Sequence, residues 1–275
     1  MFFTKVNGLG NDFIIVEENE ENISNLKKCA SKVCNRYTGI GADGILVLSK
    51  STVADLKMTI INSDGSIAEM CGNGIRCVAK YAYENKIVNK EEFEIETLAG
   101  IMKPQLFIEN GKVRDVTINM GSPFFDSNKL IAKKSIKSLV DIPVIIGNKK
   151  YLCNSVLMGV PHTVVFVDNI DDIDVCELGS IIEKNSIFLN GTNVNFVQVI
   201  DEDTLIVRTW ERGAGYTKAC GTGACSSAVI FNKIKSRHNK ICTKLQLGEL
   251  YVEWTEEGVL MTGPAETVFK GEMEV

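Results

Sequence analysis

Histidine, tryptophan and proline are scarce in this chain of 275 residues, which has two histidines, two tryptophans and five prolines. The low histidine count and the absence of any Cys-x-x-Cys unit disfavour a structural zinc site. No apolar run approaches the roughly 18 residues that a membrane-spanning helix needs. The N-terminal segment reaches polar residues too early for a signal-peptide core. A cytoplasmic protein with no membrane partner is therefore expected.

Positive charge does not exceed negative charge in this sequence. There are 30 lysines and arginines against 35 aspartates and glutamates, which gives a formal net charge of −5 and a pI of about 5.3. A nucleic-acid-binding surface needs a basic face, so no nucleic-acid partner is expected. Hydrophobic residues make up 45% of the chain and charged residues 24%, as in soluble globular proteins. The length is sufficient for two domains.

Cysteine, in contrast, is plentiful, with nine residues. An odd number in a chain without a signal-peptide core argues against a disulfide framework, and most of these thiols are expected to be buried and reduced. Two of them have a special context. Cys71 and Cys220 each precede a Gly-x-Gly unit that opens an apolar helical pattern, and they lie 149 residues apart.

Hydrophobic periodicity and turn residues predict a chain rich in short strands. Helices are predicted over residues 25–35, 72–85, 178–184 and 221–234. Strands are predicted over residues 2–6, 13–16, 45–48, 56–62, 93–97, 102–108, 113–120, 142–146, 149–157, 163–167, 193–200, 204–210, 245–247, 250–255, 259–262 and 268–273. The segments 158–162 and 211–217 are predicted to be loops.

The order strand, polar loop, Cys-Gly-x-Gly, helix occurs twice, with nine residues from Asn62 to Cys71 and ten from Trp210 to Cys220. Such a repeat indicates a duplicated domain. We predict an α+β fold of two similar domains related by a pseudo-twofold axis, each a mixed or antiparallel sheet wrapped around a central helix. The active site is expected in the cleft between them. Residues 1–120 form the first predicted domain, to which strand 266–275 can return, and residues 121–265 form the second.

A thiol at the start of a helix lies beside unpaired backbone N–H groups and the positive end of the helix dipole. This context lowers a cysteine pKa from about 8.5 toward neutrality, and the glycines that follow leave N–H groups open to a carboxylate. Two such thiols suit a two-base proton transfer. One thiolate removes a proton from carbon while the other thiol donates a proton to the opposite face, which inverts the centre.

Other functions for these cysteines stay open on this reasoning. A cysteine protease needs a general base, and only His162 could supply it. A redox dithiol or a ligand-binding protein without turnover would also use two thiols, although Cys71 and Cys220 do not form a Cys-x-x-Cys unit. Both could also be small residues that merely begin helices.

The two cysteine motifs and their surroundings resemble the diaminopimelate epimerase family over essentially the whole chain. The segments that carry the resemblance are Asn62–Ser66, Met70–Arg76, Glu211–Gly215, Ala219–Cys225, Gly8–Phe13, Gly39–Asp43, Pro161–His162 and Asn193–Phe196. The family implies an enzyme without pyridoxal phosphate, other cofactor or metal that interconverts LL- and meso-2,6-diaminopimelate in lysine and cell-wall biosynthesis. The expected partner is then a small-molecule amino acid, and a homodimer is the usual assembly of soluble proteins.

The resemblance also implies roles for individual residues. Cys71 and Cys220 are the two acid/base residues, with His162 and Glu211 as supporting groups. The backbone that holds the reacting carboxylate is that of Gly72, Asn73, Gly221 and Thr222. The distal carboxylate is held by Asn62, Asn193 and Arg212, the distal ammonium by main-chain oxygens near Glu211 and Arg212, and Asn11 completes the pocket. An arginine with two amides suits a carboxylate.

Three positions depart from the family pattern. Gly44 stands where many members have glutamine, Val160 where many have asparagine, and Tyr216 where glutamate is usual. The first two changes remove side-chain amides from the expected pocket. A cofactor-independent racemase of another amino acid, such as histidine, is therefore the alternative. The retained residues for the distal carboxylate favour a substrate with a second carboxylate.

Overall fold

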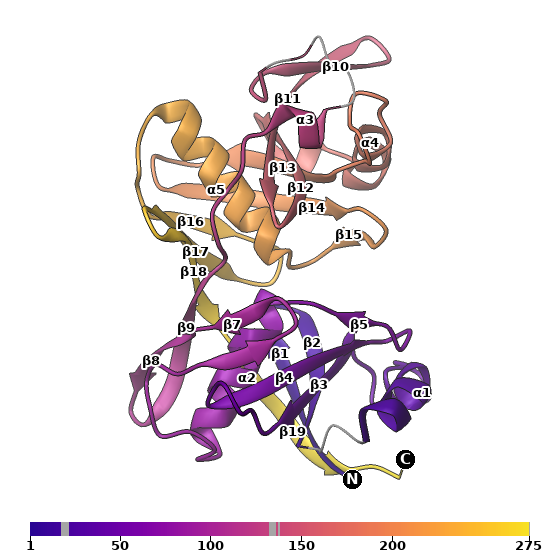
Figure 1. The fold of residues 1–275 in the computed structure, drawn as a ribbon. Coiled ribbons are helices and arrows are strands. Elements are labelled where there is room, and N and C mark those ends of the chain that lie inside the picture. The colour runs from indigo at the N-terminus through magenta and orange to yellow at the C-terminus, as the bar shows by residue number, and fades with distance from the viewer. Residues whose placement is uncertain (18–21, 132–135, 137, 275) are drawn as a thin grey trace. The chain divides into compact units, whose positions relative to one another are not determined.

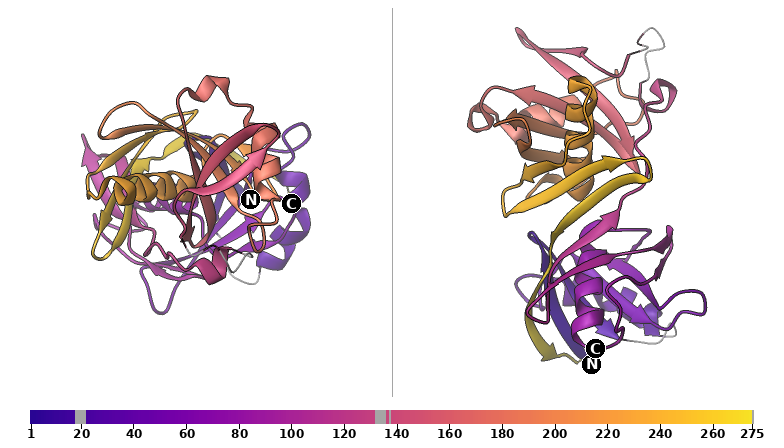
Figure 2. Two further views of the ribbon diagram at one scale, coloured as in Figure 1. Left: turned by 90° about the horizontal axis from the view of Figure 1, so that it is seen from above. Right: turned by 90° about the vertical axis from the view of Figure 1, so that its left-hand side faces the viewer.

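The computed structural model describes residues 1–17, 22–131, 136 and 138–274 (Figure 1). The chain divides into two compact units. The first unit comprises Met1–Asn119 and Thr262–Val275, and the second comprises Met120–Met261. Both termini belong to the first unit and lie side by side in every view (Figure 2), where the Met1 amino group donates to the Met273 carbonyl oxygen at 2.7 Å.

The first unit contains a mixed sheet with the strand order β19-β1-β2-β3-β4-β6-β7, and β5 pairs with β4. The pairs β2–β3 and β4–β6 are parallel, and the other pairs are antiparallel. The strands are β1 (Phe2–Gly8), β2 (Asn11–Glu17), β3 (Gly44–Ser49), β4 (Leu56–Asn62), β5 (Ile67–Ala68), β6 (Ile95–Thr97), β7 (Gly100–Met102) and β19 (Glu266–Glu272). The strands β8 (Gln105–Glu109) and β9 (Lys112–Asn119) form a hairpin.

Among its described residues, this unit contains the helices α1 (Ile23–Val33) and α2 (Gly72–Glu84). Ten of the 13 residues of α2 are buried, because the helix contacts β1, β2, β9 and β19 on different sides. The apolar run of β3 is buried along most of its length, as expected for a strand that is covered on both faces. The helix α2 is therefore the centre of the first unit.

The second unit has a mixed sheet with the strand order β10-β11-β12-β13-β14-β16-β17-β18, and β15 pairs with β14. The strands are β10 (Ile142–Ile146), β11 (Lys149–Met158), β12 (Val160–Val167), β13 (Asn193–Val199), β14 (Thr204–Glu211), β15 (Gly215–Thr217), β16 (Ile241–Lys244), β17 (Glu249–Thr255) and β18 (Gly258–Pro264). The helices are α3 (Ser127–Leu130), η2 (Ile170–Asp172), α4 (Val175–Glu183) and α5 (Gly221–Lys235). Ten of the 15 residues of α5 are buried, and this helix contacts strands from β11 to β17 (Figure 1).

The two units repeat one pattern of strand pairing. In the first, β1–β2 is antiparallel, β2–β3 parallel, β3–β4 antiparallel and β4–β6 parallel. In the second, β11–β12, β12–β13, β13–β14 and β14–β16 follow the same sequence of directions. One helix follows β5 and another follows β15, and each is largely buried. The predicted α+β class, with two similar units of mixed sheet around one helix, is confirmed.

The predicted loop 158–162 is wrong. The strand β12 already begins at Val160, so only Gly159, with a φ of +71°, separates it from β11. A proline breaks a sheet only where its missing N–H is needed. Pro161 faces Leu157, whose own N–H and carbonyl bond Phe124 instead, so no ladder bond is lost.

Two further predictions are wrong near the end of the chain. Residues 215–217 of the predicted loop form β15, which pairs with β14. Residues 245–247 form a turn instead of a strand, in which the Leu245 N–H donates to the Gly248 carbonyl, and the strand before that turn is β16. The predicted strand 266–275 corresponds to β19, which pairs with β1, and residue 275 lies outside the described residues.

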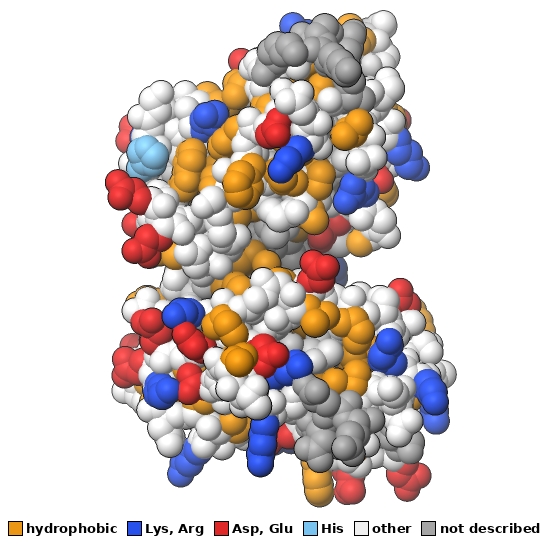
Figure 3. Space-filling view, viewed as in Figure 1, with side chains coloured by type: hydrophobic (Ala, Val, Ile, Leu, Met, Phe, Trp, Pro, Cys, Tyr) orange, Lys and Arg blue, Asp and Glu red, His pale blue; other side chains and the backbone are white. Residues whose placement is uncertain are grey.

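No described helix combines the length and apolar character that crossing a membrane requires. On the face shown in Figure 3, acidic and basic side chains are interspersed on both units.

Candidate active site

Cys71 is the N-cap residue of α2. Its backbone is extended, and its Sγ accepts a hydrogen bond from the Gly74 N–H at 3.4 Å. This is the geometry of an N-cap, in which a side chain satisfies a backbone donor of the first turn. A Cβ atom at Gly74 would lie 3.2 Å from a methyl carbon of Leu46, so glycine allows the helix to start close to β3.

Asn11 and Asn73 lie beside this thiol. The Cys71 thiol donates to the Asn11 Oδ1 at 3.5 Å, and the same oxygen accepts from the Asn73 Nδ2 at 3.2 Å. Asn11 begins β2, and Asn73 belongs to the first turn of α2. The structure thus brings together three of the residues that the sequence singled out, and an amide oxygen is the direct partner of the thiol.

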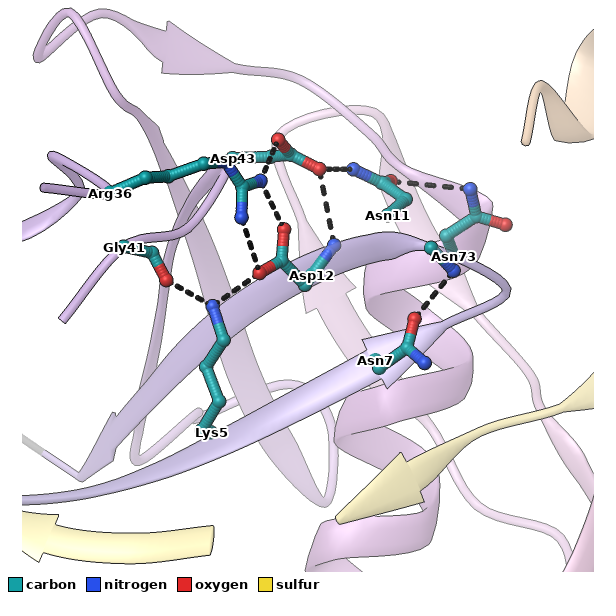
Figure 4. Close-up of polar contacts among 9 residues, drawn as sticks. Lys5, Asn7, Asn11, Asp12, Arg36, Gly41, Asp43 and Asn73 are labelled. Carbon is teal, nitrogen blue, oxygen red and sulfur yellow. Dashed lines mark hydrogen bonds and ion pairs between the residues drawn. The ribbon is translucent and has the colours of Figure 1, made fainter. Parts of the chain in front are cut away.

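A network of charged side chains holds Asn11 from the other side (Figure 4). The Asn11 Nδ2 donates to Asp43 at 2.7 Å, and Arg36 donates to Asp43 at 2.8 Å. Arg36 also donates to both carboxylate oxygens of Asp12, at 2.6 and 3.1 Å. The buried Lys5 ammonium contacts Asp12 and the Gly41 carbonyl. Asn11 is therefore oriented by a chain of ion pairs that ends in the interior of the first unit.

Burial raises the pKa of Asp12, but the hydrogen bonds from Arg36 and Lys5 and their positive charges outweigh it. The pKa of this carboxyl group consequently lies below its usual value, and Asp12 is ionised at neutral pH. The sequence reasoning gave none of Lys5, Asp12 or Arg36 a role. Lys5 and Asp12 meet across the β1–β2 hairpin, and Arg36 comes from 24 residues beyond Asp12, so the network depends on the fold and not on a local sequence pattern.

Asn62 ends β4 and pairs with Gly44. Its Nδ2 donates to the Ser66 Oγ at 2.9 Å. A Cβ atom at Gly44 would lie 2.6 Å from the Ile61 carbonyl oxygen, closer than real Cβ contacts allow. The local backbone of this chain therefore requires glycine at position 44.

Cys220 is the N-cap residue of α5 and repeats the geometry of Cys71. Its Sγ accepts from the Gly223 N–H at 3.3 Å and lies 3.5 Å from the Thr222 Oγ1. Burial raises the pKa of the Cys220 thiol well above its usual value, and the negative charge of Glu211 raises it further. The hydrogen bonds from Thr222 and Gly223 lower it by less. The expected lowering of the Cys220 pKa is therefore wrong, because burial and a carboxylate outweigh the helix start.

Glu211 is the last residue of β14 and lies within hydrogen-bonding reach of Cys220. The Thr217 hydroxyl of β15 donates to the Glu211 Oε1. This contact crosses the β14–β15 hairpin, which the sequence did not predict. The hairpin thus holds the carboxylate against the second thiol.

His162 lies on β12 and is fully buried. Its Nδ1 is 3.1 Å from the Asn195 Nδ2. Burial lowers the pKa of His162 to about 3, and the positive charge of Arg212 adds to this shift. The imidazole is therefore neutral at physiological pH.

Asn193 and Arg212 meet at the ends of neighbouring strands. The Asn193 Nδ2 donates to the Pro161 carbonyl at 2.9 Å, and its Oδ1 accepts from the Arg212 backbone N–H at 2.8 Å. The exposed Arg212 side chain donates to the Asn190 carbonyl at 2.7 Å. The Asn193 side chain thus links the main chain of Pro161 to the main chain of Arg212. This link fixes the backbone position from which the Arg212 side chain extends.

The remaining thiols differ from this pair. All nine cysteines are free, and Cys77 and Cys225 are buried within the two helices. Burial raises the pKa of Cys77 to about 12. Across the described ranges of the chain, no group of three histidine, cysteine, aspartate or glutamate side chains is arranged to hold a metal ion.

A family model described as Diaminopimelate epimerase matches residues 3–125 and 154–268 of the chain. A diaminopimelate epimerase from Caldanaerobacter subterraneus subsp. tengcongensis is 49% identical over 276 residues, and the match covers 100% of both chains. A diaminopimelate epimerase from Geobacillus sp. strain WCH70 is 46% identical, with 98% of this chain and 97% of the relative covered. The family resemblance inferred from the cysteine motifs is confirmed.

Solved structures of other enzymes share the fold. A PhzF-family phenazine biosynthesis protein from Bacillus anthracis matches with a TM-score of 0.70 at 17% identity, covering 100% of this chain and 99% of that one. A hydroxyproline epimerase from Agrobacterium vitis matches with a TM-score of 0.67 at 16% identity, covering 98% and 91%. At these identities the likeness concerns the fold alone. On the family model and the full-length relatives, this chain belongs to the diaminopimelate epimerase family.

Proposed function

We propose that this protein is a diaminopimelate epimerase that interconverts LL- and meso-2,6-diaminopimelate by two-base proton transfer at the α-carbon. Cys71 and Cys220 are the acid and the base. The observation that carries the proposal is that both thiols cap a buried helix at matching places in two repeated units, in a chain that belongs to this family. The proposal requires both units to contribute to one site, with the α-carbon between the two thiols.

The proton balance follows from the two thiols. One cysteine begins as a thiolate and takes the α-proton, and the other begins as a thiol and gives its proton to the opposite face of the carbon. Burial and Glu211 favour the thiol form of Cys220, which suits Cys220 to give the proton in one direction of the reaction, while Cys71 acts as the base in that direction. After one turnover the two protonation states are exchanged, and the reverse reaction restores them.

The reacting carboxylate is held at the helix starts. The first N–H groups of a helix have no partner within it, and they favour a negative charge. Gly72 and Asn73 provide such groups in α2, and Gly221 and Thr222 provide them in α5. These donors stabilise the charge that moves onto the carboxylate as the α-proton leaves. His162 and Glu211 support the reacting centre.

The far end of the substrate provides the specificity. Asn62, Asn193 and Arg212 bind the distal carboxylate, and main-chain oxygens near Glu211 and Arg212 accept from the distal ammonium. Asn11 completes the pocket beside Cys71. The exposed guanidinium of Arg212 suits a carboxylate, because its planar fork matches two oxygens.

The test is the exchange of solvent deuterium into the α-position, followed by NMR with diaminopimelate and a panel of other amino acids. We expect exchange with LL- and meso-diaminopimelate. Exchange with another amino acid alone, histidine for example, would replace the substrate assignment and keep the chemistry. The departures at Val160 and Tyr216, whose side chains are both 40% exposed, make this panel informative.

The cellular role and the assembly of the protein are also proposed from its membership of the family. The reaction supplies meso-diaminopimelate for lysine and peptidoglycan precursor synthesis in the cytoplasm, and the enzyme acts as a homodimer. Light scattering of the purified protein tests the assembly, and a monomer that retains full activity at assay concentration would contradict it.

A further inference from the structure

His162 and Asn195 form a polar pair inside the second unit. Both side chains are fully buried, and the His162 Nε2 has no hydrogen-bond partner among the described residues. A buried donor or acceptor without a partner is uncommon in folded proteins. The other ring nitrogen, Nδ1, lies 3.1 Å from the Asn195 Nδ2. The state of the ring therefore depends on how the Asn195 amide is oriented.

The neighbours of Asn195 determine that orientation. Its Nδ2 lies 3.3 Å from the Thr163 carbonyl oxygen, which can only accept a hydrogen bond. The Thr209 hydroxyl donates to the Asn195 Oδ1 at 2.9 Å. With the amide oriented in this way, the Nδ2 has two protons and directs one of them to the Thr163 carbonyl. The other proton points to the His162 Nδ1, which must therefore be unprotonated.

We propose that Asn195 is a positioning residue that holds His162 in the tautomer with its proton on Nε2. His162 then offers a neutral N–H donor to an oxygen of the bound amino acid and cannot act as a base there. The ligand part of this inference rests on the proposed function, whereas the tautomer does not. Burial lowers the pKa of His162 to about 3, which agrees with a ring that stays neutral.

The repeat shows that the fold itself does not need this polar pair. Matching positions of the two units lie 149 residues apart, as Cys71 and Cys220 do. On this spacing Phe13 matches His162, and Leu46 matches Asn195. The strand registers agree, because Phe13 pairs with Gly44 and His162 pairs with Asn193.

The helix glycines agree as well. A Cβ atom at Gly74 would meet Leu46 first, and a Cβ atom at Gly223 would meet the Asn195 Oδ1 first. One unit therefore fills these positions with a phenyl ring and an aliphatic side chain, and the other with an imidazole and an amide. Because an apolar pair serves the same local fold, we assign the polar pair to ligand binding.

The two histidines of the chain make the tautomer directly measurable. Protein labelled with ¹⁵N in its histidine rings gives signals from His162 and His238 alone, and His238→Asn assigns them. A long-range ¹H–¹⁵N correlation spectrum distinguishes the two tautomers. We expect an unprotonated Nδ1 and a protonated Nε2 for His162, unchanged between about pH 5 and pH 8.

Asn195→Asp tests the cause of the tautomer. A carboxylate at this position accepts from the Nδ1 and favours the charged ring, so the Nδ1 becomes protonated. We expect kcat for epimerisation to fall by about 10²-fold, as when one oriented donor is lost, with a smaller change in KM. Asn154→Asp is the matched control. Asn154 is also a buried amide that bonds a carbonyl of β12, but its side-chain partners among the described residues are Asp141, Leu152 and Val164 and not the ring, so the His162 spectrum should not change.

The outcomes separate the two proposals. An Nδ1-protonated His162 in the unmodified protein, or an Asn195→Asp spectrum identical to it, would overturn the inference whatever the activity is. The spectrum of the unmodified protein is sufficient for this test if the variant does not fold. The expected tautomer without exchange of any amino acid would instead refute the proposed function.

Discussion

The starts of α2 and α5 share a backbone but differ in their electrostatics. Cys71 and Cys220 both accept from the N–H three residues further on, at 3.4 and 3.3 Å. The partner of the first thiol is the neutral amide of Asn11, whereas the second thiol lies beside the carboxylate of Glu211. Cys71 is partly exposed and Cys220 is buried. A duplicated scaffold has thus acquired two thiols in unlike environments, which suits a pair that must begin in opposite protonation states.

The difference extends to the positions around each thiol. On the 149-residue spacing, Asn62 matches Glu211 and Gly44 matches Asn193, in agreement with the strand registers. The helix start therefore does not account for the difference between the two thiols. The end of β14 carries the carboxylate of Glu211, which raises the pKa of Cys220, whereas the end of β4 carries the neutral amide of Asn62.

The largest effect should come from removing either thiol. Cys71→Ser and Cys220→Ser each keep an oxygen that can cap the helix but lose the acid/base group, so we expect kcat to fall by about 10²- to 10⁴-fold. Steady-state epimerisation of diaminopimelate measures this. The exposed Cys176→Ser is the control and should be fully active. If only one of the two variants loses activity, the two helix starts are not partners.

Among the residues of the site, we expect the ion pairs that orient Asn11 to contribute most to the free energy of unfolding. Asp12→Asn leaves the buried Lys5 ammonium without its carboxylate, and we expect a loss of about 3 kcal/mol in the free energy of unfolding at neutral pH. Because the folded pKa of Asp12 is lowered, its contribution is present above the unfolded pKa of about 3.9. The contribution is lost as the pH falls through the folded pKa. The difference between variant and parent should therefore disappear in acid.

Urea denaturation at several pH values measures this difference. Asp55→Asn is the matched control, because Asp55 pairs with the exposed Lys90, and an exposed pair contributes about 0–1 kcal/mol. If the two variants lost the same free energy of unfolding, the ion pairs that orient Asn11 would contribute no more to stability than an exposed ion pair does.

Glu211→Gln should make the two helix starts more alike. The charge of Glu211 raises the pKa of Cys220, so its removal lowers that pKa. As Cys220 must be protonated to donate, activity is lost as the pH rises through its pKa. The variant should therefore lose activity at a lower pH than the parent, with kcat reduced by about 10-fold. The pH profile of kcat/KM measures the shift, and a move of the basic limb to higher pH would contradict the account.

The smallest effect is expected when buried polar residues of the second unit are replaced by the apolar residues at the matching positions of the first unit. The fold of the second unit should survive this change. The triple variant His162→Phe, Asn195→Leu, Thr209→Ile copies Phe13, Leu46 and Ile60. Each replacement is larger than the side chain it replaces, so we expect the variant to stay folded with a free energy of unfolding lower by about 1–3 kcal/mol, as core overpacking costs, yet to lose activity. A molten or unfolded protein would show that the polar group is required by the fold itself.

Local pattern predicted much of this structure. The strands 56–62 and 142–146 are found with the predicted bounds, because their β-branched runs end at turn residues. Both helices after the cysteines begin at the predicted glycine. The repeat also predicted two similar units, since the matching segments have the same order in the chain.

Long-range contacts account for what the sequence could not predict. Whether Pro161 interrupts a strand depends on Phe124, which takes the hydrogen bonds of Leu157. The raised pKa of Cys220 depends on its depth and on Glu211, which arrives from another strand. Asn195 lay within a motif segment, but its role appears only when the amide meets His162 and Thr209 in space.

The central claim is that two thiols act on opposite faces of one carbon. A single turnover of one diaminopimelate isomer in D₂O tests it most directly, with the deuterium at the α-carbon measured separately in product and in recovered substrate. The account predicts deuterium in the product while the recovered substrate keeps its proton, because the group that removes the proton differs from the group that donates one. Equal early labelling of substrate and product would mean that one group serves both faces, and would contradict the pairing of Cys71 with Cys220.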